Sequence, residues 1–491
     1  MTGVALEVIV APGTHRVTWT ISKPPDATTW EVAGEVELLG LRAPRASIFG
    51  RAPANWNNGP GTQRSAGWPQ RFDYPLVYGQ MNGGLDIVLI EPKLTVFGER
   101  PRAGGFMHFA GANAFFGSWA ALIGRGAPET GPVLVDSGVI QVPHLEAFAR
   151  TSPIRERSIP SDEFSVTLDP DSRLGWEDDG AEVIFEYQSS TGSWGWYGFS
   201  LAFSPVVRVK LAQPVPLSEF ITQWAWPLRG LLAAATGRQE DITYLTCSLV
   251  VDGDPSPPNQ RQFQVFHASI TQEPYASSNS LKDKDISAVR LSEGESLLAL
   301  LRRWQDLAAV QHPILNTYEI TAVGRNQQPR TRFLLLVQAL EGLYGYEYRA
   351  EIDERRAEHR GLRKPVLSRC KAALAELRDD FEFIKKFLPN RPFEPLDTAL
   401  QVLLEILPVN LEPELAASAL VQSVRAEDET ATGTLSAIRV VRNKLSHGEK
   451  AYDRSQLTEV ADILERAVRG HLLRLVGASD AAITRVLAAE D

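Results

Sequence analysis

Residues 440–448 read Val-Val-Arg-Asn-Lys-Leu-Ser-His-Gly, and they close a pattern of apolar residues at helical spacing that begins near residue 434. The pattern predicts a helix from about Thr434 to Ser446. Gly448 is placed to end this helix, because glycine readily adopts the left-handed conformation found just past many helix ends. The stretch therefore fixes a helix end in the last tenth of the chain, and we take the rest of the sequence outward from it.

Arg439, Asn443 and His447 follow one another at four-residue spacing, so they should form one polar ridge on this helix. Arg442 lies about 140° around the helix from His447 at 100° per residue, but its side chain is long. A proton shuttle and a cationic clamp can together carry an in-line phosphodiester transfer without a metal. These residue types at one helix end therefore indicate ribonuclease chemistry.

The spacing of an arginine five residues before a histidine occurs a second time, at Arg466 and His471. There Ala467 and Val468 follow the arginine in the middle of an apolar helical pattern. We interpret this second pair as part of a packed helix and not as a site.

The chain has 491 residues and a net charge of −10, so two or three domains are expected, and any nucleic-acid contact needs a local basic surface. Hydrophobic residues make up 44% and charged residues 22%, as in ordinary globular proteins. Its two cysteines, Cys247 and Cys370, are far apart and fit a reducing compartment. Because the sequence shows no signal peptide, spanning helix or metal-ligand spacing, we predict a cytoplasmic protein without metal or cofactor.

Residues 1–270 are predicted to be rich in β-strands, because short alternating stretches recur between turns of Gly, Pro, Asn and Asp. The predicted strands cover residues 30–38, 85–90, 94–98, 182–187, 194–201 and 206–211, with a turn at 189–193. One helix, at about 218–236, interrupts them. Most of the eleven tryptophans lie in this half, which favours a sandwich-like or barrel-like core. Residues 51–70 should form a loop, and Arg102–His108 lacks the features of a phosphate-binding loop.

The composition changes near residue 275, where we predict a linker over residues 271–289 and a helical domain over 290–491. The predicted helices include one opened by Ser292–Glu295, a central one at 332–344, and others at 396–406, 412–424 and 455–476. The fold class is thus α+β multidomain, with a β-rich N-terminal region followed by an all-α bundle. Residues 349–378 contain nine Lys and Arg but only five Asp and Glu. This locally basic segment fits either a solvated helix or an RNA-facing one.

The run Ala-Leu-Glu-Gly-Leu-Tyr at 339–344 and the stretch Ile-Arg-Val-Val-Arg-Asn-Lys-Leu-Ser-His-Gly at 438–448 resemble the Apea-like branch of HEPN domains. The resemblance covers roughly residues 290–475. Residues 1–270 resemble the β-rich ApeA N-terminal domain in strand pattern and order, without a diagnostic motif.

The resemblance implies a metal-independent endoribonuclease of the bacterial anti-phage type. Arg442 would stabilise the scissile phosphate, Asn443 would orient the phosphate or the imidazole ring, and His447 would act as general acid and base. Arg439, from helix register, and Glu341, an acid in an apolar helix, are expected to support them. The products would carry 2′,3′-cyclic phosphate and 5′-hydroxyl ends, and RNA loops, including those of tRNA, would be the substrates.

In this family two motifs face each other across a homodimer interface, so the helical domain is expected to dimerise. A toxic nuclease needs restraint, so the N-terminal domain is expected to sense a phage-derived trigger or to hold the bundle inactive. Three other functions stay open: a catalytically silent dimerisation or binding module, a structural bundle in which Arg442 and His447 only pair with acids or cap a helix, and a ligand-sensing β domain that carries the function.

Overall fold

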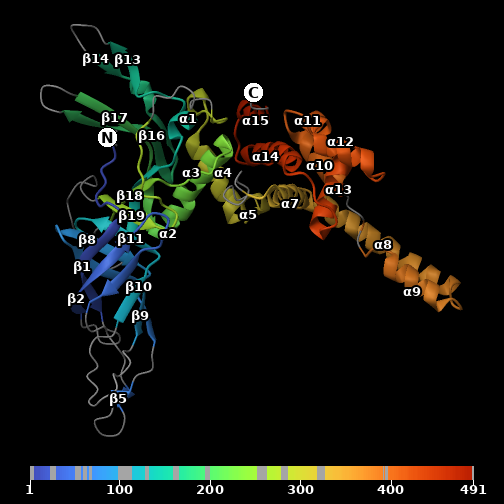
Figure 1. Ribbon diagram of the computed structural model, residues 1–491, viewed down its shortest axis with the longest axis horizontal. Coiled ribbons are helices and arrows are strands. Elements are labelled where there is room, and N and C mark those ends of the chain that lie inside the picture. Colours follow the sequence, from blue (N-terminus) through green and yellow to red (C-terminus); the bar gives the residue numbers. More distant parts are fainter. Residues whose placement is uncertain are drawn as a thin grey trace. The chain divides into compact units, whose positions relative to one another are not determined.

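The computed structural model describes residues 5–22, 29–49, 57–58, 64–65, 69–97, 113–127, 132–158, 165–193, 199–250, 262–277, 286–317, 327–390, 392 and 396–488. By its internal contacts the chain separates into two compact units. Unit 1 holds residues 1–232 and 240–301, and unit 2 holds residues 233–239 and 302–491. The first holds the described strands and a few helices, and the second is built of helices (Figure 1).

The strands of unit 1 confirm an α+β protein whose N-terminal region is an antiparallel sheet. Fifteen strands of the described residues pair in the order β15-β16-β17-β12-β18-β19-β11-β8-β7-β1-β2-β3-β10-β9-β6. Their bounds are β1 Gly13–Ser22, β2 Thr29–Leu38, β3 Arg45–Ile48, β6 Gln70–Asp73, β7 Leu76–Met81, β8 Leu85–Ile90, β9 Lys93–Phe97, β10 Asn113–Gly117, β11 Ala120–Gly124, β12 Leu134–Gln141, β15 Leu174–Glu177, β16 Ala181–Ser193, β17 Phe199–Pro216, β18 Tyr244–Leu249 and β19 Gln262–His267. Two short pairs stand outside this sheet: β4 Asn57–Asn58 with β5 Arg64–Ser65, and β13 Ile154–Ser158 with β14 Ser165–Leu168.

One hydrophobic core collects side chains from strands at distant positions in the sheet order, so the sheet curls around it. Trp19 of β1 is fully buried there, with its ring centroid 6.0 Å from that of Phe116. Gly79 lies opposite Trp19 in the neighbouring strand, and a Cβ at Gly79 would come within 2.7 Å of the indole ring. Glycine at this position leaves the room that the indole needs.

The β16–β17 hairpin differs from the sequence prediction. Residues 189–193, predicted as a turn, belong to β16, and Ser193 pairs with Phe199. Residues 199–201 of the strand predicted at 194–201, and the strand predicted at 206–211, are parts of one strand, because β17 continues through Pro205 opposite Tyr187. Residues 194–198 lie outside the described residues. Ser and Thr residues adopt an extended backbone as readily as a turn conformation. A cluster of them is therefore a weak signal for a turn.

The predicted helix at 218–236 is present, but it starts at Leu217 and contains one wide turn. It comprises α2 Leu217–Phe220, a π-helical turn at Ile221–Ala225 and α3 Trp226–Thr236. Pro227 lies just after the wide turn. Proline has no N–H to give to the preceding turn, and a π turn is one way that a helix accommodates such a defect.

Three short helices complete unit 1: α1 Leu145–Ala149, and two 3-10 helices at Pro170–Ser172 and Leu291–Glu293. The compact units divide at Leu301, within α4, which runs from Leu297 to Ala309. This division lies later in the chain than the start expected for the helical domain. Of the predicted linker, residues 278–285 lie outside the described residues, and Ser287 and Val289 are buried.

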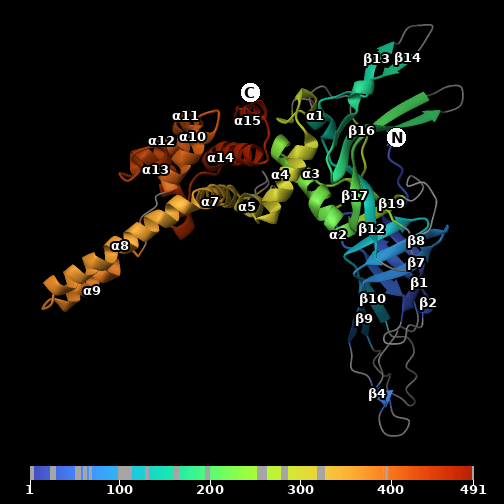
Figure 2. The same ribbon diagram turned by 180° about the vertical axis from the view of Figure 1, so that it is seen from behind.

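Unit 2 is a bundle of helices around α7, Pro329–Glu347. The others in unit 2 are α5 Pro313–Thr317, α8 Arg349–Ala373, α9 Arg378–Phe387, α10 Leu396–Ile406, α11 Glu412–Ala417, α12 Ala419–Glu427, α13 Thr434–His447, α14 Arg454–Leu475 and α15 Asp480–Leu487. Helix α7 packs against α5, α10, α13 and α14, which confirms the central position predicted from its apolar sequence. Helices α8 and α9 extend beyond these bundle helices in both views (Figures 1 and 2).

Two details of unit 2 correct the predictions. The helix expected at 412–424 is split at Ser418, whose backbone is extended and whose hydroxyl bonds to the Leu415 carbonyl at 2.7 Å. Helices α9 and α15 were not predicted. Both are short, with ten and eight residues.

Candidate functional site

Helix α13 ends where the sequence predicted. Gly448 has φ 70°, in the left-handed region, and its N–H donates to the Leu445 carbonyl at 3.2 Å. The next amide, of Glu449, donates to the Lys444 carbonyl at 2.9 Å, so two of the last carbonyls of the helix are satisfied. Ile438, Val441 and Leu445 are buried, and this apolar face holds α13 in the bundle.

Arg442 is held by two side chains. Its guanidinium donates to the Glu341 carboxylate of α7 at 2.9 Å and to the Asn443 side-chain oxygen at 3.2 Å. The Arg442 and Glu341 side chains are 36% and 31% exposed, so solvent reaches both partners of this pair. The structure thus brings together three of the five residues named from the sequence.

His447 lies on the last turn of α13 and is exposed. At the same helix end the guanidinium of Arg330, from the first turn of α7, donates to the Leu445 carbonyl at 2.6 Å. A cation is favourable here because the carbonyls at a helix C-terminus carry partial negative charge. No local pattern marks Arg330 as part of this helix end, because it lies 115 residues before its acceptor.

The Arg439 side chain contacts different partners from those of Arg442. Its Nε lies 3.6 Å from the Asp397 carboxylate of α10, and its Nη2 donates to the Thr430 carbonyl at 3.4 Å. These contacts connect α13 to α10 and to the loop that precedes α13. None of the contacts found in the described residues joins Arg439 to Arg442 or His447, so its expected supporting role remains a prediction.

Lys444, between Asn443 and His447, is engaged with acids of the preceding segment. Its ammonium lies 2.5 Å from the Asp428 carboxylate. This hydrogen bond with Lys444 lowers the pKa of Asp428, helped by bonds from Thr430, and the same bond raises the pKa of Lys444. The Lys444 ammonium is therefore paired mainly with a carboxylate of the protein itself.

The second pair with the same spacing, Arg466 and His471, is structural. Arg466 donates to the Leu487 carbonyl at 2.7 Å and pairs with Glu414. His471 is fully buried, and burial lowers its pKa to about 3. This arrangement confirms the interpretation of a packed helix.

One cavity of unit 2, with a volume of about 360 Å³, lies further along α7 from Glu341. Tyr346, Arg349 and Arg356 line it, together with Gly342 and Pro313. It contains none of the residues predicted for the site.

The basic segment 349–378 contains all of α8, the turn that follows it and the first residue of α9. One of its cations has a structural role, because the Arg363 guanidinium donates to the Pro389 carbonyl at 3.1 Å and to the Leu388 carbonyl at 3.3 Å. Other cations, such as Arg360 and Lys364, are exposed. An RNA-facing role for this segment stays a prediction.

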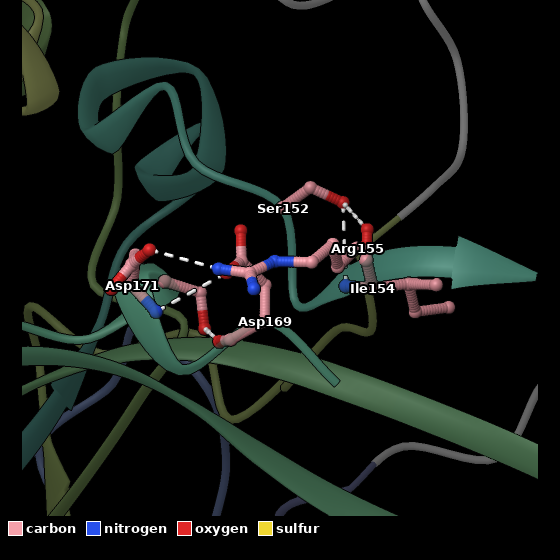
Figure 3. A network of polar contacts seen from close by, with 6 residues as sticks. Ser152, Ile154, Arg155, Asp169 and Asp171 are labelled. Carbon is pink, nitrogen blue, oxygen red and sulfur yellow. Dashed lines mark hydrogen bonds and ion pairs between the residues drawn. The ribbon is translucent and has the colours of Figure 1, made fainter. Parts of the chain in front are cut away.

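Unit 1 offers polar clusters of another kind. In the clearest one, Arg155 of β13 donates to Asp169 at 3.0 Å and to Asp171 at 2.9 Å (Figure 3). The Arg155 and Asp171 side chains are more than half exposed, and such ion pairs contribute at most about 1 kcal/mol. We interpret this cluster as one that fixes the base of the β13–β14 hairpin. Residues 102–108 lie outside the described residues.

Metal sites and membrane-spanning helices are both absent from the described residues. In that part of the chain no group of three or more His, Cys, Asp or Glu is placed to hold a metal ion. Within the same ranges, no helix has the length and apolar character needed to cross a membrane. Cys247 is buried and Cys370 half-buried, and both are free thiols.

Comparison of the chain with protein-family models, curated proteins and solved structures finds no match in any of the three. The resemblance drawn from the sequence therefore rests on the motif and on the helix order alone. What it implies about activity is taken up below as a proposal.

Proposed function

We propose that this chain is a metal-independent endoribonuclease whose site is formed by Arg442, Asn443 and His447. The observation that supports it most is the arrangement at the end of α13. A guanidinium steadied by Glu341 and Asn443 lies within two helical turns of an exposed imidazole. The reaction would be attack of a ribose 2′-hydroxyl on the adjacent phosphate, leaving 2′,3′-cyclic phosphate and 5′-hydroxyl ends.

Arg442 would bind the scissile phosphate and stabilise the charge that develops on it. A guanidinium has five N–H donors, and the bonds to Glu341 and Asn443 take two of them. The planar group can still bind a phosphate with two parallel hydrogen bonds. Glu341 would fix the plane of the guanidinium before substrate binds, which is how preorganised charge lowers a barrier.

His447 would move the protons of the reaction. An imidazole can both accept and donate a proton near neutral pH, as removal of the 2′-hydroxyl proton and protonation of the leaving 5′-oxygen require. Its exposed place on the last turn of α13 gives an RNA strand access to the ring. Unpaired loops, including those of tRNA, are favoured substrates, because an unstacked backbone can reach in-line geometry.

The biological role follows the family resemblance. The chain would act in bacterial defence against phage, with two copies bringing two motifs together through the helical unit. The β-rich unit would receive the infection signal or restrain cleavage. RNA and a second copy of the chain are thus the proposed partners, and no metal or cofactor takes part.

A catalytically silent binding module, with ligand sensing by the β-rich unit, is the second candidate, and one observation favours it. Arg442 pairs with Glu341, Arg439 lies near Asp397 and Lys444 pairs with Asp428, so each of these cations on α13 already has a carboxylate partner. Ion pairs of this kind occur in helical bundles without any catalytic role. The two candidates differ in what the loss of His447 should do.

The test is digestion of total bacterial RNA by the full chain in the presence of EDTA, with analysis of fragment ends. Arg442→Ala and His447→Ala should abolish cleavage. The matched controls Arg425→Ala, an exposed arginine on α12, and Ser446→Ala, the exposed neighbour of His447, should leave cleavage unchanged. Cleavage by His447→Ala at the wild-type rate would refute the proposed mechanism.

A further inference from the structure

The cavity along α7 lies within the helical unit and is large enough for a small molecule. Its volume of about 360 Å³ falls in the range of ligand pockets, roughly 300–1,000 Å³. The described residues that line it come from α5, α7 and α8, and none of them belongs to the site proposed for cleavage. That site therefore does not explain the cavity.

Two arginines give the cavity its charge. Arg349 and Arg356 lie seven residues apart on α8, so both are on the same side of that helix. They share one carboxylate, since the Arg349 Nε lies 3.8 Å from the Asp353 carboxylate and the Arg356 guanidinium donates to it at 3.4 Å. Among the described residues that line the cavity, none is acidic. Two guanidiniums against one carboxylate leave a net positive charge at the cavity.

A phosphate group suits this pair of cations. A guanidinium is planar and presents parallel N–H donors that match two phosphate oxygens. The Arg349 side chain is 77% exposed, so an anion can reach it from solvent. The same positive charge disfavours a metal ion or a cationic ligand in this cavity.

The other lining side chains are aromatic or apolar. Tyr346 is 37% exposed, and the buried imidazole of His312 packs against its ring, with centroids 4.5 Å apart and an interplanar angle of 66°. The tyrosine ring is therefore held on one side while part of it remains open. Ile352, only 3% exposed, adds an apolar contact in the lining. An exposed aromatic ring binds a planar ring of a ligand by stacking.

Two glycines of α7, Gly342 and Gly345, leave the backbone bare at the cavity. Glycine weakens the interior of a helix, so its presence there calls for a reason. Packing within the protein supplies none, because an added Cβ would meet nothing within 4 Å at Gly345 and only Pro313 at 3.8 Å at Gly342. Glycine also allows a ligand to approach the backbone closely, which fits a cavity that binds one.

We propose that this cavity binds one nucleotide, with its phosphate on Arg349 and Arg356 and its base against Tyr346. A nucleotide combines the two groups that the lining favours, an anionic phosphate and a planar ring. A free mononucleotide and one nucleotide of an RNA strand present the same two groups, and the experiment below separates them. This inference goes beyond the proposed function, because binding requires neither the Arg442 site nor cleavage.

The experiment is isothermal titration calorimetry of the full chain with AMP. AMP should bind with a dissociation constant on the order of 10–100 μM. Adenosine, which lacks the phosphate, and inorganic phosphate, which lacks the ring, should each bind at least about tenfold more weakly. Where AMP binds, an affinity no higher than that of inorganic phosphate would overturn the proposal.

Variants locate the binding in this cavity. Arg349→Ala should weaken AMP binding at least about tenfold, whereas Arg360→Ala, which removes an exposed cation of α8 outside the cavity, should not. Gly345→Leu should abolish binding, because the new side chain occupies the cavity. Its matched control is Gly361→Leu, which has equal room for a side chain outside the cavity and should bind AMP as wild type does. Circular dichroism should show all four variants folded, because the substituted positions are exposed.

A non-cleavable RNA separates the two sources of the nucleotide. A short oligoribonucleotide with 2′-O-methyl groups has no hydroxyl to attack the adjacent phosphate. If AMP binds and Gly345→Leu abolishes its binding, the cavity takes a free mononucleotide. If AMP does not bind but the oligonucleotide binds wild type at least about tenfold more tightly than Gly345→Leu, the cavity takes a nucleotide of an RNA strand.

Two results would overturn the proposal: neither probe binds wild type, or both bind Gly345→Leu as they bind wild type. RNA cleavage is not read out, so each result leaves the nuclease proposal to its own test.

Discussion

Arg332 offers the sharpest test of what holds the helical unit together. It lies on α7 and is only 3% exposed, with its guanidinium 2.5 Å from Asp462 and in contact with Glu465, both on α14. Glu465 is 9% exposed and Asp462 is 48% exposed. Arg332→Met keeps most of the side-chain volume but removes the cation that faces a buried carboxylate.

The expected cost follows from that burial. Breaking a buried ion pair by removing one partner destabilises a protein by about 3–5 kcal/mol, because a charge is left in a poorly solvated place. Most of the cost should come from Glu465, since the half-exposed Asp462 can be solvated by water. For a domain of this size, each kcal/mol lowers Tm by about 2–4 °C, so we expect a decrease of about 6–20 °C.

The assay is thermal and urea unfolding of the full chain, following the transition of the helical unit. Arg332→Met combined with Glu465→Leu should recover most of the loss, because apolar residues can replace a buried ion pair. Lys385→Ala, which breaks an exposed pair with Glu382, should change the free energy of unfolding by less than about 1 kcal/mol. The reasoning fails if the double variant is no more stable than Arg332→Met, or if Arg332→Met costs no more than Lys385→Ala.

Three further predictions concern α13, α14 and the site. Glu341→Gln should leave Arg442 in place but reduce RNA cleavage about tenfold through kcat, while the free energy of unfolding changes by less than about 1 kcal/mol; equal cleavage rates would exclude a positioning role for the carboxylate. Gly448→Ala should lower the free energy of unfolding by about 1–2 kcal/mol. The loss comes from backbone strain alone, because φ is 70° while no atom lies within 4 Å of the added Cβ. Gly361→Ala, in the interior of α8, should leave the free energy of unfolding unchanged or raise it in the same urea titration. Burial lowers the pKa of His471 to about 3, so between that pH and about 6.5 the unfolded chain binds a proton that the folded chain does not, and stability falls as the pH falls through this window by up to about 5 kcal/mol. A His471→Leu variant should show a shallower decline over the same window, and an unchanged slope would contradict this assignment.

Local signals in the sequence located most of the helical unit. Helix α10 has the predicted bounds, and α13 ends at His447, one residue past the predicted Ser446, with Gly448 in the terminating position as predicted. A periodic apolar face and a terminal glycine are signals carried within a few residues. Glu341 could be named because an acid in an apolar helix needs a partner, and its partner proved to be Arg442, 101 residues later.

Features that depend on distant neighbours could not be predicted. The bond from Arg330 to the Leu445 carbonyl exists only because α7 and α13 cross in the folded bundle. The long β16–β17 hairpin is set by pairing along two whole strands, which outweighs the turn-forming character of residues 189–193. Helix α9 was missed although Phe381, Ile384 and Leu388 recur at helical spacing, because the helix has only ten residues.

The composition of unit 2 also determines how this protein can be divided for experiments. Residues 233–239 belong to the helical unit although they precede its other members by more than 60 residues. Within that unit the buried Arg469 guanidinium donates to the carbonyls of Ala234 at 2.8 Å and Ala235 at 3.1 Å. A fragment beginning at residue 285 would lack both acceptors and leave the buried Arg469 guanidinium without these two hydrogen bonds. A change in the toxicity of such a fragment would therefore have two possible causes: removal of the β-rich unit, or damage to the helical bundle. Cleavage at a protease site inserted into a loop outside the described residues, after the full chain has folded, would keep every segment present and separate the two effects.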